Sequence, residues 1–116
     1  MDLNHIHLHV RDISSSRNFY ERYFGFQRER VNKGDFLILQ NSDGFDLAFT
    51  LDPEPKPVPE WFHFGFRLAG PEAVQEMYSR MVSEGVPIQK SLTEYKNYLT
   101  FFCLDPDGYV IEIYWM

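Results

Sequence analysis

The segment LNHIHLHV, residues 3–10, alternates polar and apolar side chains with a period of two. In an extended chain, this alternation places the apolar side chains of residues 6, 8 and 10 on one face. The imidazoles of His5, His7 and His9 then lie on the other face. The segment therefore predicts a half-buried strand with a row of histidines on its open face.

A helix and three further strands are predicted to follow. The segment 12–16 offers several N-cap residues, aromatic residues at positions 19, 20, 23 and 24 recur at helical spacing, and Gly25 is suited to end the helix. Strand-like runs at 26–31, 35–40 and 45–51 are separated by turn-forming residues. The first half thus predicts the order βαβββ.

The second half repeats this order after a connector. Residues 52–60 hold four of the seven prolines, which favours an extended linker. A strand at 61–68, a helix from Pro71 to about Ser83, and strands at 88–92, 99–104 and 109–115 follow. We therefore expect one α+β domain, 1–116, built from two βαβββ modules at about 1–51 and 61–116.

Composition limits the classes of function. A chain of 116 residues that is 44% hydrophobic suits one compact domain. The net charge of −6, with no basic stripe, disfavours nucleic acid as a partner, and no apolar run is long enough for a membrane helix. The single Cys103 cannot form an intramolecular disulfide, so we expect a reducing, cytoplasmic setting.

Histidine and carboxylate residues recur at matching places in the two halves. His5 and His63 lie near the start of each half, and Asp46 and Glu112 lie in its last strand. Imidazole and carboxylate together suit a divalent Fe, Mn, Ni, Co or Zn ion. Glu112 lies among apolar and aromatic neighbours, where an unpaired buried charge is costly. The sequence predicts a metal site, with solvated polar side chains on an outer strand face as the alternative.

Other residues are candidates for contacts with a substrate. Alternation places Arg67 on one face with Trp61 and His63, where it binds an anionic group or forms a salt bridge. Tyr98 and Tyr114 are candidate hydrogen-bond donors, with packing as the commoner role. Alternation also groups Glu112 with Tyr114 on one face of the last strand.

The whole chain resembles the vicinal oxygen chelate superfamily, which includes glyoxalase I, fosfomycin-resistance enzymes, extradiol dioxygenases and bleomycin-resistance proteins. The resemblance lies in residues 3–12, Phe19-Tyr20-Glu21, Phe24-Gly25-Phe26, His63-Phe64-Gly65-Phe66 and Leu104-Asp105-Pro106-Asp107-Gly108-Tyr109-Val110-Ile111-Glu112-Ile113. It implies a U-shaped mixed sheet around a central cleft, with His5, His63 and Glu112 as metal ligands. It also implies a homodimer in which one site can take its two modules from different subunits.

The resemblance implies a glyoxalase-like enzyme of the lyase or isomerase type, whose small substrate chelates the metal through neighbouring oxygens. Asp46 stands where glyoxalase-like members are expected to add a fourth ligand, and it is also a candidate base. His7 and His9 are candidates to orient a metal ligand or to contact the substrate. They stand where fosfomycin enzymes and glyoxalase I have threonine and arginine, which disfavours fosfomycin and glutathione. The alternatives are a bleomycin-resistance-type binding protein without catalysis, a small extradiol dioxygenase, and a domain that only dimerises.

Overall fold

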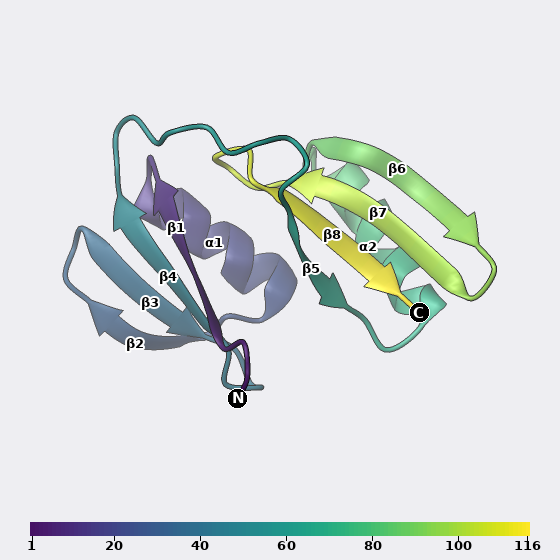
Figure 1. Ribbon diagram of the computed structural model, residues 1–116, viewed down its shortest axis with the longest axis horizontal. Coiled ribbons are helices and arrows are strands. Elements are labelled where there is room, and N and C mark those ends of the chain that lie inside the picture. The colour runs from purple at the N-terminus through teal and green to yellow at the C-terminus, as the bar shows by residue number, and fades with distance from the viewer. The chain divides into compact units, whose positions relative to one another are not determined.

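The chain folds as two compact units. The computed structural model describes residues 1–116, and the units are Met1–Pro57 and Val58–Met116. Their boundary falls inside the proline-rich segment, where residues 52–60 form neither helix nor strand. Each unit holds four strands and one helix in the order βαβββ (Figure 1). The predicted α+β class and its internal repeat are confirmed.

The first unit is a four-stranded mixed sheet with one helix. Its elements are β1 (His5–Val10), α1 (Ile13–Phe24), β2 (Arg28–Asn32), β3 (Phe36–Gln40) and β4 (Asp46–Leu51). The strand order is β1-β4-β3-β2; β1 runs parallel to β4, and the other neighbours are antiparallel. β1 begins two residues later than the alternation predicts. α1 starts directly after Asp12, which lies in the segment predicted to provide its N-cap.

Local signals set the ends of α1. The Asp12 carboxylate accepts hydrogen bonds from the backbone N–H groups of Ser14 and Ser15, which no turn of the helix can satisfy. Gly25 ends the helix in the left-handed conformation, with φ of 70°, which lacks a steric penalty only for glycine. The helix is thereby fixed over one face of the sheet, where Tyr20 packs against Phe49.

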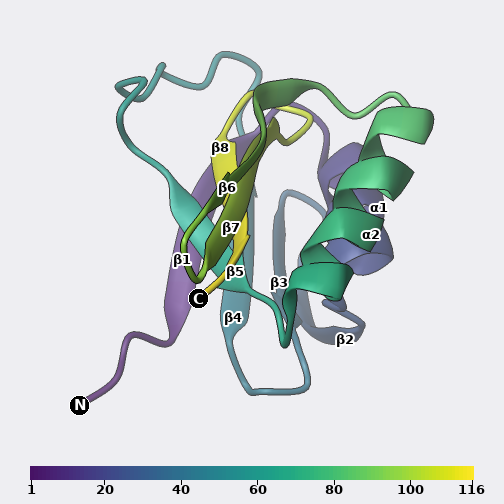
Figure 2. The same ribbon diagram turned by 90° about the vertical axis from the view of Figure 1, so that its right-hand side faces the viewer.

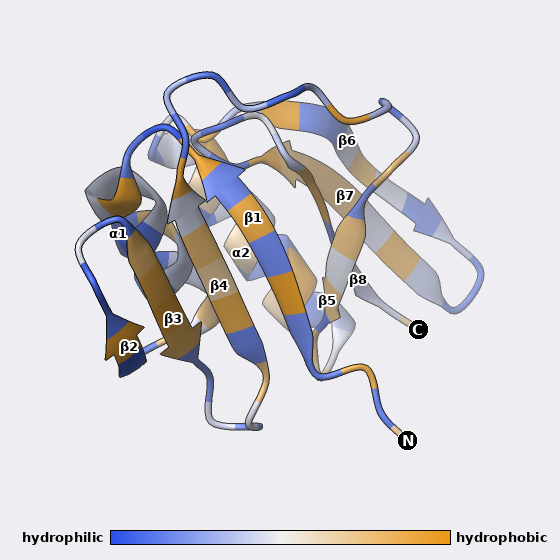
Figure 3. Ribbon diagram, turned by 60° about the vertical axis from the view of Figure 1, so that its left-hand side comes forward, coloured by the Kyte–Doolittle hydropathy of each residue, from blue (hydrophilic) through white to orange (hydrophobic).

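The two faces of this sheet differ in character. The face toward α1 holds buried apolar side chains from β1, β3 and β4, namely Leu8, Val10, Leu37, Leu39, Leu47 and Phe49. The opposite face carries the three exposed histidines of β1. Figure 3 shows the resulting alternation of hydrophilic and hydrophobic residues along β1. The polar face is therefore the one on which functional side chains are available.

The second unit repeats the topology. Its elements are β5 (Phe64–Arg67), α2 (Pro71–Ser83), β6 (Ile88–Tyr95), β7 (Tyr98–Leu104) and β8 (Val110–Trp115), with strand order β5-β8-β7-β6. β5 is parallel to β8. α2 covers one face of the sheet (Figure 2), and the core between them contains Val74, Met81, Phe101, Ile111 and Ile113.

Two predicted strand boundaries are wrong. β5 begins at Phe64, because residues 59–62 form a turn in which the Phe62 N–H donates to the Pro59 carbonyl. Trp61 is therefore outside the strand and does not share a strand face with His63. β6 continues to Tyr95, because its last residues pair with β7 up to a tight turn at Lys96–Asn97.

Neither α1 nor α2 has the length and apolar composition that crossing a membrane requires.

Candidate functional site

Glu112 is the centre of a polar cluster in the second unit. Its side chain is 13% exposed. The hydroxyl groups of Tyr98 and Thr100 both donate to its Oε2 atom, the latter at 2.7 Å. Its Oε1 atom lies 3.5 Å from Nε2 of His63. The carboxylate is thus held at one oxygen and faces an imidazole with the other.

The strand pattern of β8 places Glu112 there. Ile111 and Ile113 are fully buried on the side of α2, so the alternate residues Glu112 and Tyr114 lie on the open face, as the sequence predicts. Glu112 pairs with Phe102 of β7 and with Gly65 of β5. β7 therefore supplies the two hydroxyl groups around the carboxylate, and the residue before β5 supplies the imidazole.

His63 precedes β5 by one residue and is oriented by two contacts. Its Nδ1 atom lies 3.3 Å from the Trp61 carbonyl oxygen, and its ring meets Phe102 edge-on with centroids 5.1 Å apart. The carbonyl contact favours the tautomer with the proton on Nδ1. In that tautomer Nε2 carries a lone pair toward the Glu112 carboxylate. Two acceptors that face each other are held together by a proton or cation between them.

Gly65 allows β5 to lie close against Glu112. A Cβ atom added at this position would lie 3.0 Å from the Glu112 carbonyl oxygen and 3.2 Å from the Glu112 Cβ. Its third neighbour would be the Tyr114 ring at 3.6 Å. A side chain at position 65 would therefore crowd the backbone and Cβ of Glu112 and push β5 and β8 apart.

Tyrosines form one wall next to Glu112. Tyr98 stacks on Tyr95 with ring centroids 5.6 Å apart, and it meets Tyr114 at a steep angle with centroids 6.2 Å apart. Burial, and then the hydrogen bond to the Glu112 carboxylate, raise the pKa of Tyr98 above its ordinary value. Its hydroxyl therefore stays protonated near neutral pH and acts as a donor. The donor role predicted for Tyr98 has a specific partner, whereas Tyr114 contributes packing.

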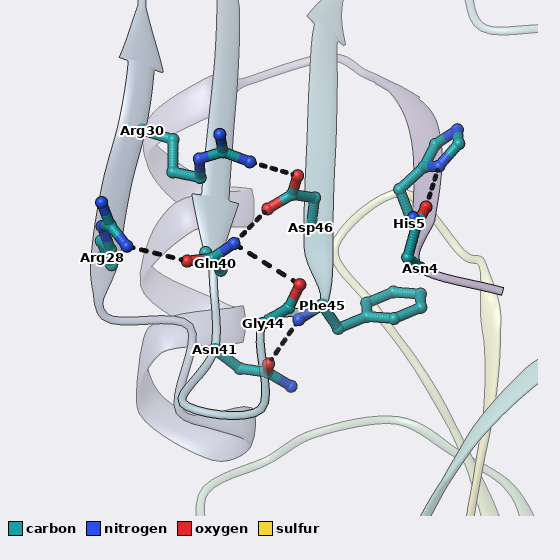
Figure 4. Close-up of polar contacts among 9 residues, drawn as sticks. All are labelled: Asn4, His5, Arg28, Arg30, Gln40, Asn41, Gly44, Phe45 and Asp46. Carbon is teal, nitrogen blue, oxygen red and sulfur yellow. Dashed lines mark hydrogen bonds and ion pairs between the residues drawn. The ribbon is translucent and has the colours of Figure 1, made fainter. Parts of the chain in front are cut away.

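His5 lies on the open face of the first unit. Its Nδ1 atom is 2.8 Å from Oδ1 of Asn4, and its Nε2 has no partner within the unit. The ring is exposed at the start of β1 (Figure 4). One nitrogen is thus fixed locally while the other is available to a ligand.

Both carboxylate oxygens of Asp46 already have protein donors. Gln40 donates to Oδ1 at 3.0 Å, and Arg30 donates to Oδ2 at 2.6 Å. Arg28 donates in turn to the Gln40 side-chain oxygen at 3.1 Å. Figure 4 shows these side chains reaching across neighbouring strands toward one another. Asp46 is therefore part of a polar network on the sheet.

The strand registers correct the predicted equivalence of Asp46 and Glu112. In the second unit Glu112 pairs with Gly65, two residues after His63. In the first unit the residue two after His5 is His7, and its partner is Ala48. Ala48 thus occupies the place equivalent to Glu112. The Asp-Gly turn before the last strand of each unit gives the same correspondence, because Glu112 lies five residues after Asp107 and Ala48 lies five residues after Asp43.

The other candidate residues have individual partners or none. His7 Nε2 lies 2.7 Å from the Thr50 hydroxyl, and His9 Nδ1 lies 2.9 Å from the Asp52 carboxylate. That contact is the main cause that lowers the pKa of Asp52. Arg67 is exposed in β5 and has no carboxylate partner within its unit. Within neither unit do three or more His, Cys, Asp or Glu side chains gather as a ligand set.

Comparisons with known proteins agree with this fold. The sequence model of the Glyoxalase/Bleomycin resistance protein/Dioxygenase superfamily matches residues 2–113. The chain is 26% identical to a Bacillus subtilis (strain 168) protein described as a probable trivalent organoarsenical cleaving enzyme; the match spans 96% of this chain and 77% of that protein. It is 27% identical to Glyoxylase I 4 of Arabidopsis thaliana, over 96% of this chain and 68% of that protein.

Solved structures with the same fold include proteins of this superfamily. A protein from Bacillus cereus described as a possible glyoxalase superimposes with a TM-score of 0.84 at 29% identity, and the match covers 97% of each chain. The fosfomycin resistance protein of Listeria monocytogenes superimposes with a TM-score of 0.83 at 18% identity, over 100% of this chain and 93% of the other. The second likeness concerns the fold alone.

Proposed function

Because this chain belongs to the glyoxalase/bleomycin resistance protein/dioxygenase superfamily, we propose that it is a metal-dependent, glyoxalase-like enzyme of the lyase or isomerase type. Its small substrate binds a divalent Fe, Mn, Ni, Co or Zn ion through two neighbouring oxygens. His63 and Glu112 of one unit and His5 of the other are the proposed ligands. The observation that carries the proposal is the Glu112 carboxylate, which is held at Oε2 and turned toward His63 with Oε1.

The residues around Glu112 fit a metal ion. Two ligand atoms that each bind one ion at about 2.0–2.2 Å stand roughly 3–4 Å apart, and the His63 Nε2 to Glu112 Oε1 distance is 3.5 Å. Gly65 lets β5 approach the backbone of Glu112 closely, so that the strand just after His63 lies directly beside Glu112. The Nε2 atom of His5, which has no partner within its own unit, is the third donor of the proposed set; two imidazoles and one carboxylate suit the ions named above.

Each residue has a distinct part in the proposed chemistry. When bound, the ion supplies Lewis acidity that stabilises negative charge as it develops on a substrate oxygen. Tyr98 and Thr100 hold Glu112 Oε2, so that Oε1 keeps one orientation. Ala48, in the place equivalent to Glu112, provides no fourth carboxylate. Three protein ligands with open positions are the arrangement typical of catalytic ions.

Asp46 has a conditional role in this proposal. It serves as a fourth ligand or as a base only if it releases Gln40 and Arg30, which hold both of its oxygens. The three-ligand set does not require that rearrangement, so we rank it first. His7 and Arg67 lie on open strand faces, and we retain them as candidates for a base and for a contact with the substrate.

Metal analysis of the purified protein tests the proposal. We expect about one tightly bound ion per chain in the wild type and its loss in Glu112→Gln, which keeps the side-chain shape but removes the charge. The matched control is Glu94→Gln, an exposed carboxylate of β6 that should leave the metal content unchanged. Equal metal content in wild type and Glu112→Gln would contradict the assignment. Screening catechols, methylglyoxal with thiols, and acyl-CoA epimers against each metal form then separates the lyase, dioxygenase and isomerase reactions.

A second candidate function is ligand binding without turnover, as in bleomycin-resistance proteins. The wall formed by Tyr95, Tyr98 and Tyr114 favours it, because aromatic faces bind cationic and flat ligands without a metal. Thermal stabilisation by a ligand that persists after chelator treatment supports this function. Stabilisation that disappears with the metal supports the enzyme.

A further inference from the structure

We propose that Arg28 and Arg30 form a binding site for an anionic group of the substrate, a carboxylate or a phosphoryl group, on the open face of the sheet β1-β4-β3-β2. This inference rests on the proposed function, because it assumes that His5, which lies on the same sheet face, binds the metal and so marks the adjoining part of the substrate site. It deepens that function by stating the chemical class of the substrate.

Strand register brings these residues into one row. Arg28 pairs with Gln40, Gln40 pairs with Asp46, and Asp46 pairs with His5. Residues directly opposite each other on neighbouring strands project from the same face of a sheet. The row therefore runs across all four strands on the face away from α1, and it ends at the imidazole of His5.

A β-bulge places Arg30 in this row. The pairing of β2 with β3 shifts between Glu29 and Val31, so Arg30 is the additional residue of the bulge. Bulges bend the strand and redirect a side chain. Figure 4 shows Arg30 extending from β2 across β3 toward Asp46 on β4. The bulge thus gives the edge strand a guanidinium that reaches the middle of the sheet.

Hydrogen bonds order both guanidinium groups but leave most of their donors free. Arg30 uses Nη1 to donate to Asp46 at 2.6 Å, and Arg28 uses Nη1 to donate to Gln40 at 3.1 Å. Gln40 also donates to Asp46, which links the two contacts. A guanidinium has five N–H donors in a rigid fork. Neither arginine has another protein partner, so ordered donors remain available to a planar or tetrahedral anion.

The local charge has the sign that such a ligand needs. Glu29 lies between the two arginines in sequence but pairs with Leu39, on the opposite face. It forms an ion pair with Arg17 at 2.7 Å, which lowers the pKa of its carboxyl group. Asp46 is then the one carboxylate in a row that holds two guanidinium groups, and it is paired with Arg30 alone. Although the chain has a net charge of −6, two guanidinium groups and one carboxylate leave this row with a net positive charge near His5.

The spacing of strands limits the size of the substrate. Asp46 lies on the strand next to His5, and neighbouring strands are about 4.7–4.9 Å apart. Arg30, held at Asp46, is therefore within roughly 5–10 Å of His5. The fitting substrate carries its anionic group only a few bonds from the two oxygens that bind the metal.

Titration of the full chain with inorganic phosphate and, separately, with acetate tests this site. Side-chain Nε–H and amide NMR signals are followed before and after removal of metal by a chelator. We expect saturable shifts at Arg28, Arg30 and the Gln40 amide in both states, because the site needs no ion. A larger response to phosphate identifies a phosphoryl group, and a larger response to acetate identifies a carboxylate. Absence of saturation, or saturation that is lost with the metal, would overturn the proposal independently of the metal analysis.

Variants localise the effect. Arg30→Gln should weaken binding of the preferred anion roughly tenfold, because it removes charge-assisted hydrogen bonds. Arg28→Gln should act in the same direction and provides the test if Arg30→Gln does not fold. The controls are Lys33→Gln, in the loop after β2, and Lys56→Gln, an exposed lysine of the proline-rich connector. Both should change the affinity less than about twofold. An equal loss in the controls would indicate general charge screening and overturn the assignment.

Discussion

Glu112 divides its two oxygen atoms between two tasks. Oε2 accepts hydrogen bonds from two hydroxyl groups, and Oε1 faces His63. A carboxylate that is held in this way loses little rotational freedom when a cation binds, so less free energy is spent on orientation. The two hydroxyls of β7 are therefore positioning groups for the metal site that we propose.

Removal of the Tyr98 hydroxyl tests this positioning. Tyr98→Phe should lower metal affinity about 10–100-fold, the usual effect of losing a group that orients a ligand. The measurement is competition for the metal with a chromogenic chelator. Tyr95→Phe is the matched control, since Tyr95 stacks on Tyr98 without a hydrogen bond to Glu112. Unchanged affinity in Tyr98→Phe would show that the hydroxyl does not position the ligand.

Cys103 should be chemically inert in the folded protein. Its side chain is fully buried, and burial raises the pKa of its thiol to about 12. A disulfide reagent at pH 8 should react only as fast as the protein opens, and immediately in denaturant. Rapid reaction of the native protein would contradict this burial.

The same thiol makes stability depend on pH. In the unfolded chain it ionises near pH 8.5–9, whereas in the folded chain it stays protonated to about pH 12. Its contribution is complete below about pH 8.5 and is lost as pH rises toward 12. At pH 10 the free energy of unfolding should fall by roughly 1–2 kcal/mol more in wild type than in Cys103→Ala. Denaturant titrations of both proteins at pH 8 and pH 10 measure the difference.

At the scale of the element, alternation predicts faces better than it predicts ends or registers. The period of two in β1 and β8 correctly assigns His5 and Glu112 to open faces, because one buried face fixes the pattern. The predicted equivalence of Asp46 and Glu112 is wrong because it relied only on the position of each residue in the last strand of its unit. Pairing with the first strand of each unit decides which residues correspond, and it selects Ala48.

Side-chain contacts between strands could not be predicted from the sequence either, because they also depend on which strands pair. Tyr98 and Thr100 precede Glu112 by 14 and 12 residues, and they meet it only because β7 folds back against β8. The Arg30 contact with Asp46 depends on a bulge, which no composition signal marks. Local patterns thus identified the ligand candidates, and tertiary pairing supplied the groups that orient them.

Gly65 links the geometry of β5 to Glu112, and Gly65→Ala tests that link. The new methyl group meets the Glu112 backbone and should cost about 1–3 kcal/mol of stability, with weaker metal binding. Gly70→Ala is the control, because its added Cβ meets only the flexible carboxylate end of Glu72. It should cost less than about 1 kcal/mol and leave metal binding intact. Thermal unfolding and metal titration measure both, and wild-type metal affinity in Gly65→Ala would contradict the proposed role.

At the scale of the whole molecule, the proposed ligands are divided between the two repeated units. In each unit one helix packs on one face of the sheet, and the other face of the sheet carries polar side chains. His5 belongs to one unit, and His63 and Glu112 belong to the other. The proposed ligand set therefore needs both units, which are supplied either by one chain or by two copies of it.

Mixing two variants that do not bind metal shows whether one chain or two chains supply the units of a site. We expect a homodimer in which each site combines units from both chains. His5→Gln and Glu112→Gln should each lose the metal alone. After joint refolding, half of the dimers are mixed and each holds one intact site, so about one quarter of wild-type binding returns. His63→Gln mixed with Glu112→Gln is the control and should restore none, because both changes lie in the same unit. If neither mixture regains metal while wild type is dimeric, each site belongs to a single chain, and the two units of that chain bind the ion together.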